Sequence, residues 1–523
     1  MKGNLYLTGF MGAGKSTVGR ELASVLKRSF VDLDEAIVAR LGMPVIQAFA
    51  RLGEEGFRDA ERSELKRLAR RQRLVVAVGG GAPESAENRR VMRASGRMLH
   101  LDASLEICRA RLGPAETAQR PLWRDETALA GLFERRREIY ADCDFNVLTD
   151  GLSPQAVAEA LCARLLPDQR FEVRLGRAVC PVIATWNGPA AAREALGGRR
   201  AALLSERRVA GLHGGRYQAA LAGEAGGPAL VVVAPGEGSK SLMGTGRVYR
   251  ALLDGRIERG DLLVALGGGM VTDLGAYVAA TYKRGMDFVL VSTSLLGCVD
   301  AAVGGKAALN LGQAKNIIGL FTTPKAVVLD LRALATLPRA QVAEGLVEAY
   351  KTGLAAEPGL AALIEAELPA AKAGDLLVLA EVAAASARAK AKVVGEDFRE
   401  ADRRRILNLG HTYGHAVEGF HRYRVSHGRS VAVGLMVAAA LSAGRGLLSA
   451  EAAQRIMDTV GGLAATGFAW PTVDHAWPIM VHDKKNQGGR VIFVLLAEGG
   501  EPVIVDDVTP TELTRAIARA RGE

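Results

Sequence analysis

Gly9-Phe10-Met11-Gly12-Ala13-Gly14-Lys15-Ser16 is the stretch that decides the fold of the first part of this chain. It follows a short apolar run at residues 5–8 and precedes a segment with helical periodicity. This G-x-x-x-x-G-K-S pattern is typical of a P-loop, in which the glycines let backbone N–H groups turn inward around a phosphate. In such a loop Lys15 reaches the β- and γ-phosphates and Ser16 binds Mg²⁺. The stretch therefore predicts a nucleoside triphosphate site between a strand and a helix.

The composition indicates a multidomain soluble enzyme. The chain has 523 residues, of which 49% are hydrophobic, and this length suggests about three to four domains. The longest apolar stretch, 431–444, is too short to span a bilayer, and the N-terminus lacks a secretory pattern, so we expect a cytoplasmic location. The five cysteines contain no C-x-x-C pair, so neither a disulfide framework nor a thiolate zinc site is expected.

The net charge of +10 fits small anionic substrates as well as nucleic acid. The basic runs, 135–137 and 403–405, are short, and no aromatic-rich RNA-binding signature lies beside them. We therefore expect small-molecule substrates, no nucleic acid and no membrane partner.

Alternating apolar runs and helical stretches predict a doubly wound α/β domain with a parallel sheet up to about residue 163. We expect its strands at 5–8, 30–33, 74–78, 98–101 and 145–148. The helix predicted at 154–166 is followed by a polar break, Pro167 to Arg170, where we place a domain boundary.

A second α/β region follows this break, and a helical region follows it in turn. Strands are expected at 201–204, 229–233, 262–266, 288–291 and 326–329, and a late hairpin at 491–496 and 503–505. After Pro338 the sequence is mostly helical and Ala-rich. The predicted domains are thus a P-loop domain (1–167), a nucleotide-binding α/β domain (168–337) and a mainly α-helical metal-binding domain (338–523).

Candidate substrate groups of the first domain follow its predicted strands. Asp32-Leu33-Asp34-Glu35 comes after the second strand, at the sheet edge where open α/β folds bind ligands. Asp32 is suited to supporting Mg²⁺ through water, and Asp34 to accepting a substrate hydroxyl. The third strand ends in Gly79-Gly80-Gly81, which leaves a bare backbone surface for a small ring. Arg58, Arg120 and Arg136 can bind a carboxylate or phosphate with two hydrogen bonds, although each taken singly is a common surface residue.

The strings G-F-M-G-A-G-K-S-T-V-G, F-V-D-L-D, E-E-G-F-R, V-G-G-G and R-P-L-W closely resemble shikimate kinase across the first domain. The resemblance implies ATP-dependent phosphorylation of shikimate with Mg²⁺. It implies that Arg120 lies on a lid, 113–124, that closes over the phosphates. The implied residues are Gly12, Ala13, Gly14, Lys15, Ser16, Thr17 and Arg120 for ATP, Ser16 for Mg²⁺, Asp34, Arg58, Gly80 and Arg136 for shikimate, and Asp34, Lys15 and Arg120 for catalysis.

A second candidate site contains a histidine cluster. His411 and His415 lie four residues apart on one predicted helix, a spacing typical of metal ligands, and His427 follows in a loop-like segment. Spacing alone pairs His411 with His415. Glu348 and Lys351 share one face of another helix, where a surface ion pair is the alternative interpretation.

Upstream of the histidines, glycine-rich turns carry many charges. The strand 262–266 runs into Gly267-Gly268-Gly269 and a helix with Asp273, which resembles a phosphate cradle but lacks G-x-G-x-x-G. The turn 235–240 offers another phosphate or ribose contact. Arg284, Asp300, Lys306, Lys315 and Asn316 stand at positions that we expect to be loops. This excess of cations favours a substrate with both phosphate and carboxylate.

The strings L-G-G-G-M-V-T-D-L, V-D-A-A-V-G-G-K, G-L-V-E-A-Y-K-T-G, L-N-L-G-H-T-Y-G-H and D-K-K-N resemble 3-dehydroquinate synthase from about residue 171 onward. The resemblance implies NAD⁺, zinc or cobalt, and the metal ligands Glu348, His411 and His427, which moves His415 to the substrate. The implied NAD residues are Glu237, Lys240, Gly269, Met270, Val271, Thr272, Asp273, Thr293, Ser294, Lys306, Lys315, Ala333 and Thr336. The implied substrate and catalytic residues are Arg284, Asp300, Lys306, Asn316, Lys351, Arg404, Asn408, His415 and Lys484.

The implied reaction converts 3-deoxy-D-arabino-heptulosonate 7-phosphate to 3-dehydroquinate. NAD⁺ takes a hydride from the C5 alcohol, phosphate leaves by elimination, the hydride returns, and the opened enol closes the ring. One residue departs from the family's pattern: Arg429 follows His427-Gly428 where glutamate is usual. This departure predicts that a carboxylate behind the metal ligands is missing.

Three alternatives remain open at this point. A metal-dependent polyol dehydrogenase shares the triglycine loop and paired histidines, and another sugar-phosphate cyclase is closer still. A nucleotide-gated scaffold leaves the metal set and the cations unexplained. The sequence leaves open whether the chain is a monomer or a homodimer through its second half.

Overall fold

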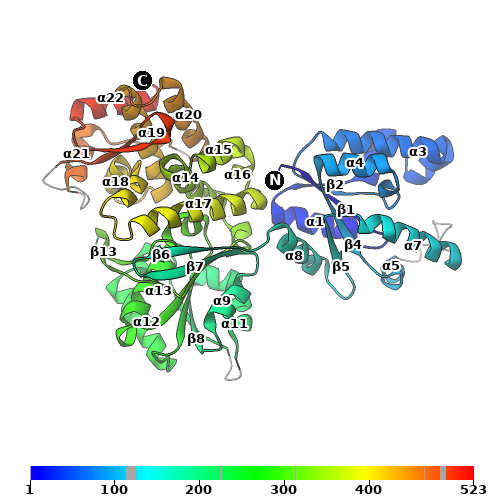
Figure 1. Ribbon diagram of the computed structural model, residues 1–523, viewed down its shortest axis with the longest axis horizontal. Coiled ribbons are helices and arrows are strands. Elements are labelled where there is room, and N and C mark those ends of the chain that lie inside the picture. Colours follow the sequence, from blue (N-terminus) through cyan, green and yellow to red (C-terminus); the bar gives the residue numbers. More distant parts are fainter. Residues whose placement is uncertain (1, 113–124, 224–226, 313, 465, 483–489) are drawn as a thin grey trace. The chain divides into compact units, whose positions relative to one another are not determined.

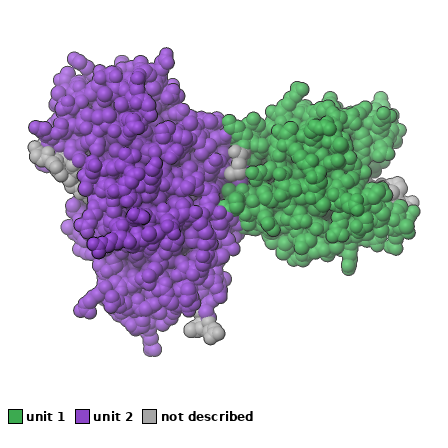
Figure 2. Space-filling view, viewed as in Figure 1, with its two compact units in different colours: residues 1–167 green, residues 168–523 purple. Residues whose placement is uncertain are grey.

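The structure is a computed structural model that describes residues 2–112, 125–223, 227–312, 314–464, 466–482 and 490–523. The chain divides into two compact units, Met1–Pro167 and Asp168–Glu523, shown in two colours in Figure 2. Arg120, Lys484 and the expected lid 113–124 lie outside the described residues. Within the described ranges, no single helix is long and apolar enough to cross a membrane. One helix pair, Leu33–Leu41 with Val45–Ala69, has the combined length and composition but is bent by 88°.

Unit 1 is built on a five-stranded parallel sheet with the strand order β2-β3-β1-β4-β5 (Figure 1). Its strands are β1 (Asn4–Thr8), β2 (Ser29–Asp32), β3 (Leu74–Ala77), β4 (Gly96–Asp102) and β5 (Phe145–Leu148). Both β1 and β3 are buried at every position, as expected for apolar strands covered on both faces. Because β1 pairs with β3 on one side and β4 on the other, the P-loop leaves the middle of the sheet.

The helices of unit 1 connect these parallel strands. They are α1 (Lys15–Leu26), α2 (Leu33–Leu41), α3 (Val45–Ala69), η1 (Ala82–Glu84), α4 (Ala86–Ser95), α5 (Leu105–Arg111), α7 (Glu126–Ala141) and α8 (Pro154–Leu165). The predicted strand 30–33 is shifted by one residue, because β2 begins at Ser29 and ends at Asp32. Asp32 accepts hydrogen bonds from the backbone N–H groups of Asp34 and Glu35, so it caps α2 and ends β2.

The first half of unit 2 contains a seven-stranded sheet with the order β6-β7-β14-β11-β10-β8-β9. The strands β6 and β7 form an antiparallel pair at one edge, and the remaining neighbours are parallel. The strands are β6 (Gln169–Leu175), β7 (Ala178–Thr185), β8 (Ala201–Glu206), β9 (Ala229–Val233), β10 (Leu262–Gly267), β11 (Asp287–Ser292) and β14 (Ala326–Asp330). The predicted α/β class is therefore confirmed for both sheets.

Helical segments and a small hairpin surround this second sheet. The helical segments are α9 (Gly188–Leu196), α10 (Arg207–Val209), η3 (Ala210–Gly214), α11 (Gly215–Leu221), η4 (Glu237–Ser239), α12 (Leu242–Asp254), α13 (Gly269–Thr281), η5 (Tyr282–Arg284), η6 (Gly297–Ala301) and η7 (Ala333–Thr336). The hairpin consists of β12 (Lys306–Leu311) and β13 (Ala314–Phe321). The expectation that Lys306, Lys315 and Asn316 lie in loops is therefore wrong, because all three belong to the hairpin strands. Asp300, also expected in a loop, lies in η6.

The second half of unit 2 is mainly helical, as predicted (Figure 1). Its helices are α14 (Arg339–Ala356), α15 (Pro358–Ala366), α16 (Leu368–Ala373), α17 (Leu376–Glu396), η8 (Arg403–Asn408), α18 (His411–Phe420), α19 (His427–Gly444), α20 (Ala450–Leu463), α21 (Val473–Val481) and α22 (Pro510–Arg521). The late hairpin is formed by β15 (Phe493–Leu496) and β16 (Pro502–Val505) around η9 (Glu498–Gly500). A division of unit 2 at residue 337 remains our proposal.

Candidate active sites

The P-loop of unit 1 connects β1 to the N-terminus of α1. Gly12 and Gly14 have φ angles of 84° and 91°, a backbone region that favours glycine. Lys15 Nζ donates to the carbonyl oxygens of Gly9 and Phe10 at 2.9 and 3.1 Å. The loop therefore holds a cation at the start of a helix of 12 residues, where backbone N–H groups and the helix dipole favour phosphate.

A hydroxyl and a carboxylate meet beside this loop. Ser16 Oγ donates to Asp32 Oδ2 at 2.5 Å, while Asp32 Oδ1 accepts from the backbone N–H of Asp34 at 3.0 Å. Hydroxyl and carboxylate oxygens are the ligands that Mg²⁺ prefers. Of the other residues expected at ATP, Ala13 is buried in the loop and Thr17 is exposed in the first turn of α1.

Three predicted substrate groups converge on the triglycine after β3. A Cβ added at Gly79 would lie 2.8 Å from Asp34 Oδ1, one at Gly80 would lie 3.2 Å from Arg136 Nη1, and one at Gly81 would lie 2.4 Å from Arg58 Nη2. Only a bare backbone leaves room for all three side chains. One acceptor and two guanidinium groups thus surround a flat floor, an arrangement that suits a hydroxylated ring with a carboxylate.

Two glutamates that the sequence interpretation missed position the arginines. Arg58 Nη1 donates to both carboxylate oxygens of Glu61 at 3.2 and 3.1 Å, and Arg136 Nε donates to Glu84 Oε1 at 2.8 Å. Burial raises the pKa of Glu61, and the charge of Arg58 opposes that rise. The signal for Glu61 was its position three residues after Arg58 on one helix; Glu84 gave none, because its partner lies far away in the sequence.

The predicted metal ligands come together from three helices of unit 2. Glu348 on α14 places Oε1 3.8 Å from His411 Nε2 and 3.4 Å from His427 Nε2. These three residues offer ligand atoms that all lie within 4.8 Å of one another. Within the described ranges, Glu348 Oε1 is buried without a hydrogen-bond partner. A buried acceptor that faces two imidazoles fits a divalent cation, because one carboxylate and two histidines are a common zinc set.

His415 joins a second group with the same ring of His427. His415, Glu418 and His427 also offer ligand atoms within 4.8 Å of one another, and the His411 and His415 ring centroids are 5.2 Å apart. His427 is the first residue of α19, so its expected placement in a loop is wrong. The structure thus places His411, His415 and His427 close together. It does not favour the pair His411 and His415, which spacing alone selects, over the other candidate metal ligands.

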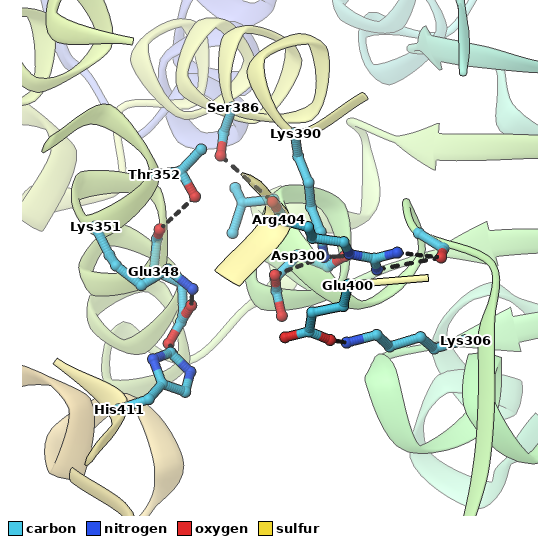
Figure 3. Close-up of polar contacts among 12 residues, drawn as sticks. Asp300, Lys306, Glu348, Lys351, Thr352, Ser386, Lys390, Glu400, Arg404 and His411 are labelled. Atoms are coloured by element: carbon cyan, nitrogen blue, oxygen red, sulfur yellow. Dashed lines mark hydrogen bonds and ion pairs between the residues drawn. The ribbon is translucent and has the colours of Figure 1, made fainter. Parts of the chain in front are cut away.

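Next to the metal candidates lies a set of charges, most of them buried, which Figure 3 shows. Lys390 Nζ donates to Asp300 Oδ1 at 2.6 Å, and Lys351 Nζ donates to Glu348 Oε2 at 2.5 Å. Burial opposes the charge on Asp300, but Lys390 and Lys351 outweigh it and hold the pKa of Asp300 below its ordinary value. Burial lowers the pKa of Lys390 to about 8 against the opposing charge of Asp300.

Two further predicted residues border this set. Arg404 is buried and donates to the carbonyl oxygens of Gly304 and Phe398 at 3.1 and 2.8 Å. Glu400, which the sequence interpretation missed, accepts from Asn408 Nδ2 at 3.0 Å and pairs with Lys306. The predicted Asp300, Lys306, Lys351, Arg404 and Asn408 therefore gather in one place, around Lys390 and Glu400.

The predicted dinucleotide residues lie mainly at the carboxyl ends of the second sheet. Gly269 to Asp273 form the first turns of α13, directly after β10, and Thr293 and Ser294 follow β11. Lys240 is buried, pairs with Asp273, and donates to Asn316 Oδ1. Of the others, Glu237 accepts from Asn310 Nδ2 at 3.0 Å, and Thr336, which shares η7 with Ala333, contacts His213 Nε2 at 3.0 Å. Met270, Val271 and Thr272 lie within the first turns of α13.

Arg284 lies at the opposite end of α13 from Gly269, in the segment that follows this helix. It is exposed and follows α13, whereas Gly269 begins that helix. A helix of 13 residues is about 20 Å long. The predicted contact of Arg284 with the heptulosonate phosphate is therefore left without support from the geometry.

The expected lack of a carboxylate behind the metal ligands is wrong. Glu418 Oε1 lies 3.5 Å from His427 Nδ1, and Arg429 instead lies with its guanidinium 4.9 Å from the centre of the Phe468 ring. Among the missed residues, Lys390 had one signal: a lysine on an Ala-rich, otherwise apolar face of α17. Glu418 had none beyond its place one turn after His415.

Comparison with known proteins divides the chain into two parts that correspond to the two units of the structure. Residues 11–166 match the family described as shikimate kinase, and residues 230–344 and 345–486 match the N-terminal and C-terminal regions of 3-dehydroquinate synthase. The 3-dehydroquinate synthase of Rhodopseudomonas palustris (strain BisB18) is 39% identical over 369 residues, which cover 68% of this chain and 94% of that protein. The chain belongs to the 3-dehydroquinate synthase family. Its first unit is a shikimate kinase domain.

Two further similarities concern the second unit. The 3-dehydroquinate synthase of Halorhodospira halophila is 40% identical over 328 residues, which cover 61% of this chain and 90% of that protein. A solved structure of the 2-epi-5-epi-valiolone synthase ValA from Streptomyces hygroscopicus, with NAD⁺ and Zn²⁺ bound, is 25% identical with a TM-score of 0.62. It covers 66% of this chain and 98% of that one. The chain thus combines a shikimate kinase with a 3-dehydroquinate synthase, two enzymes of the shikimate pathway that act on small molecules.

Proposed function

We propose that the kinase unit transfers the γ-phosphoryl group of ATP to shikimate, and that the synthase unit cyclises 3-deoxy-D-arabino-heptulosonate 7-phosphate with NAD⁺ and a divalent metal. The observation that carries the synthase proposal is the buried Glu348 Oε1, which faces His411 and His427 and, within the described ranges, lacks a hydrogen-bond partner. The convergence of Asp34, Arg58 and Arg136 on the triglycine supports the kinase proposal.

In the kinase site, the P-loop and the triglycine floor would hold the two substrates. Lys15 would leave the loop carbonyls for the β- and γ-phosphates, and Ser16 with Asp32 would hold Mg²⁺. Asp34 would accept the proton of the attacking hydroxyl. Arg58, held by Glu61, and Arg136 would fix the substrate carboxylate, while Gly80 supplies the backbone surface. Arg120 remains part of the proposal as a lid residue.

In the synthase site, Glu348, His411 and His427 would hold zinc or cobalt. The N-terminus of α13 would face the dinucleotide phosphates. The backbone is closely packed there: a Cβ at Gly268 would lie only 3.0 Å from Ser294 Oγ, and a Cβ at Gly269 only 3.1 Å from Ala301 Cβ. Glycine at both positions permits this packing. When bound, the metal would make a substrate hydroxyl more acidic and NAD⁺ would accept and return a hydride. The proposed NAD contacts are those that the resemblance implies.

The buried charges would bind and orient the anionic substrate. Lys351, Lys390 and Arg404 present cations around Asp300, with Lys306 beside Glu400. The paired carboxylates hold these cations in place until a substrate carboxylate or phosphate takes over part of the pairing. His415, beside the metal candidates, would exchange a proton with the substrate. Arg284, Asn316, Asn408 and Lys484 remain proposed substrate contacts.

The proposal is tested by two assays on one preparation: phosphate release from the heptulosonate phosphate, and shikimate-dependent ADP formation. Thorough removal of zinc should abolish phosphate release and, once Mg²⁺ is restored, leave ADP formation unchanged. A synthase that keeps its rate without metal would contradict the metal assignment. Accumulation of NADH would favour a polyol dehydrogenase, and turnover of a different sugar phosphate would favour another cyclase. A cytoplasmic location and a homodimer through the synthase unit remain predictions.

A further inference from the structure

Glu418 is a buried carboxylate outside the proposed ligand set. It contacts one proposed ligand, His427, at the ring nitrogen that does not face Glu348. It belongs to α18, and its side chain is only 4% exposed. Its Oε1 lies 3.5 Å from His427 Nδ1 and 3.1 Å from Lys315 Nζ. An anion is seldom buried unless it is paired, so these two contacts explain why the carboxylate is tolerated there.

The ring of His427 stands between two carboxylates. Its Nε2 faces Glu348 Oε1 at 3.4 Å, and its Nδ1 faces Glu418 Oε1 at 3.5 Å. An imidazole that gives one nitrogen to a metal keeps its proton on the other, and that proton needs an acceptor. Glu418 is placed to be that acceptor. The contact would fix the tautomer of His427 and aim Nε2 at the space beside Glu348.

A second contact holds Glu418 in place from the other half of the unit. Lys315 belongs to β13, and its ammonium group also lies 4.5 Å from the centre of the Tyr423 ring. The cation is therefore held between a carboxylate and an aromatic face. Because Lys315 pairs with the same oxygen that faces His427, the hairpin helps to hold this carboxylate beside the histidine.

We propose that Glu418 is a positioning residue for the metal site, which orients His427 as a ligand without binding the metal itself. The inference rests on the proposed function of the synthase unit. The competing assignment makes Glu418 a direct ligand together with His415 and His427, whose ligand atoms also lie within 4.8 Å. The contacts of the two carboxylates favour Glu348 over Glu418 as the ligand, because Glu418 Oε1 already pairs with Lys315. Glu348 Oε1, by contrast, is buried and accepts no hydrogen bond from any described residue.

The test compares zinc affinity by competition with a chromophoric chelator in the full chain. Glu418→Gln keeps the shape of the side chain and removes its charge, and we expect zinc affinity to fall by about 10- to 100-fold. Glu418→Asp keeps the charge but withdraws the carboxylate by one methylene, so a smaller loss is expected. Glu512→Gln, which removes a carboxylate paired with Arg445 elsewhere in the helical half, should leave zinc affinity within about twofold.

The cobalt-loaded protein distinguishes positioning from ligation. We expect the d–d absorption bands of Glu418→Gln at full cobalt loading to match the wild type, and those of His411→Ala to change, because of these two residues only His411 is a proposed ligand. Unchanged zinc affinity in both Glu418 variants would overturn the proposal. So would altered cobalt bands in Glu418→Gln together with unaltered bands in His411→Ala, since Glu418 would then be a ligand. Failure of the wild type to bind either metal would instead refute the proposed function.

Discussion

Gly81→Ala should damage the kinase through one defined collision. The φ of Gly81 is −88°, which alanine adopts without strain, so the effect comes from the added methyl group alone. That Cβ would lie 2.4 Å from Arg58 Nη2, whereas ordinary contact begins at 3.4 Å, so the guanidinium must withdraw by 3.4 − 2.4 = 1.0 Å. A displacement of about 1 Å at a group that positions substrate costs about 100-fold in rate, or about 2.7 kcal/mol.

The assay is steady-state ADP formation with shikimate and ATP varied separately. We expect kcat/KM for shikimate to fall by about 100-fold while KM for ATP stays near that of the wild type, because the P-loop is not touched. Gly131→Ala is the matched control: it lies in α7, and its added Cβ would approach Arg135 Nη1 only to 3.9 Å. Phosphate release by the synthase unit reports folding of the same chain. Full kinase activity in Gly81→Ala would refute the role given to Arg58.

Three further predictions concern the metal, the unit boundary and pH. His427→Ala should lower zinc content by elemental analysis, whereas His415→Ala should keep zinc and lose turnover; equal zinc in wild type and His427→Ala would favour the His411 and His415 pairing. Residues 1–167 and 168–523, expressed separately, should each keep kcat within about threefold, about 0.7 kcal/mol, and an insoluble half would show that the units complete one another. Because burial lowers the pKa of Lys390 to about 8, this cation is lost as pH rises through 8, so the synthase KM should rise there. Lys390→Arg should remove that rise, and an unchanged pH profile would exclude Lys390 from substrate binding.

Local patterns in the sequence were sufficient to predict the elements that define the fold. The P-loop follows β1 because its glycines and lysine form a continuous motif, and strands such as 145–148 and 229–233 agree with the structure to the residue. The hairpin of β12 and β13 was missed because β13 has no buried residue and the glycine-rich sequence around it also fits a loop. The placement of His427 in a loop was wrong although Ser426, a residue type favoured at the N-cap, directly precedes α19 and could have marked its start.

The site residues also divide into those that the sequence predicts and those that it does not. Residues inside continuous motifs, such as Glu348 and His411, could be selected from the sequence. Glu84, Glu400 and Glu418 could not, because each gains its role from a partner that lies between 8 and 103 positions away and reaches it only through the fold. A charge pair between separate elements produces no periodic pattern in the sequence. The tertiary structure is therefore needed to find such groups.

The central claim is that two independent active sites share this chain, and Lys15→Ala tests it most directly. Lys15 donates to the carbonyl oxygens of its own loop and lies in the unit that does not contain the metal cluster. Shikimate-dependent ADP formation and phosphate release from the heptulosonate phosphate should be measured on the same preparation of this variant. We predict that ADP formation is lost, because Lys15 would neutralise charge on ATP, and that phosphate release keeps the wild-type rate. Loss of both activities in a folded variant, or survival of ADP formation, would contradict the account.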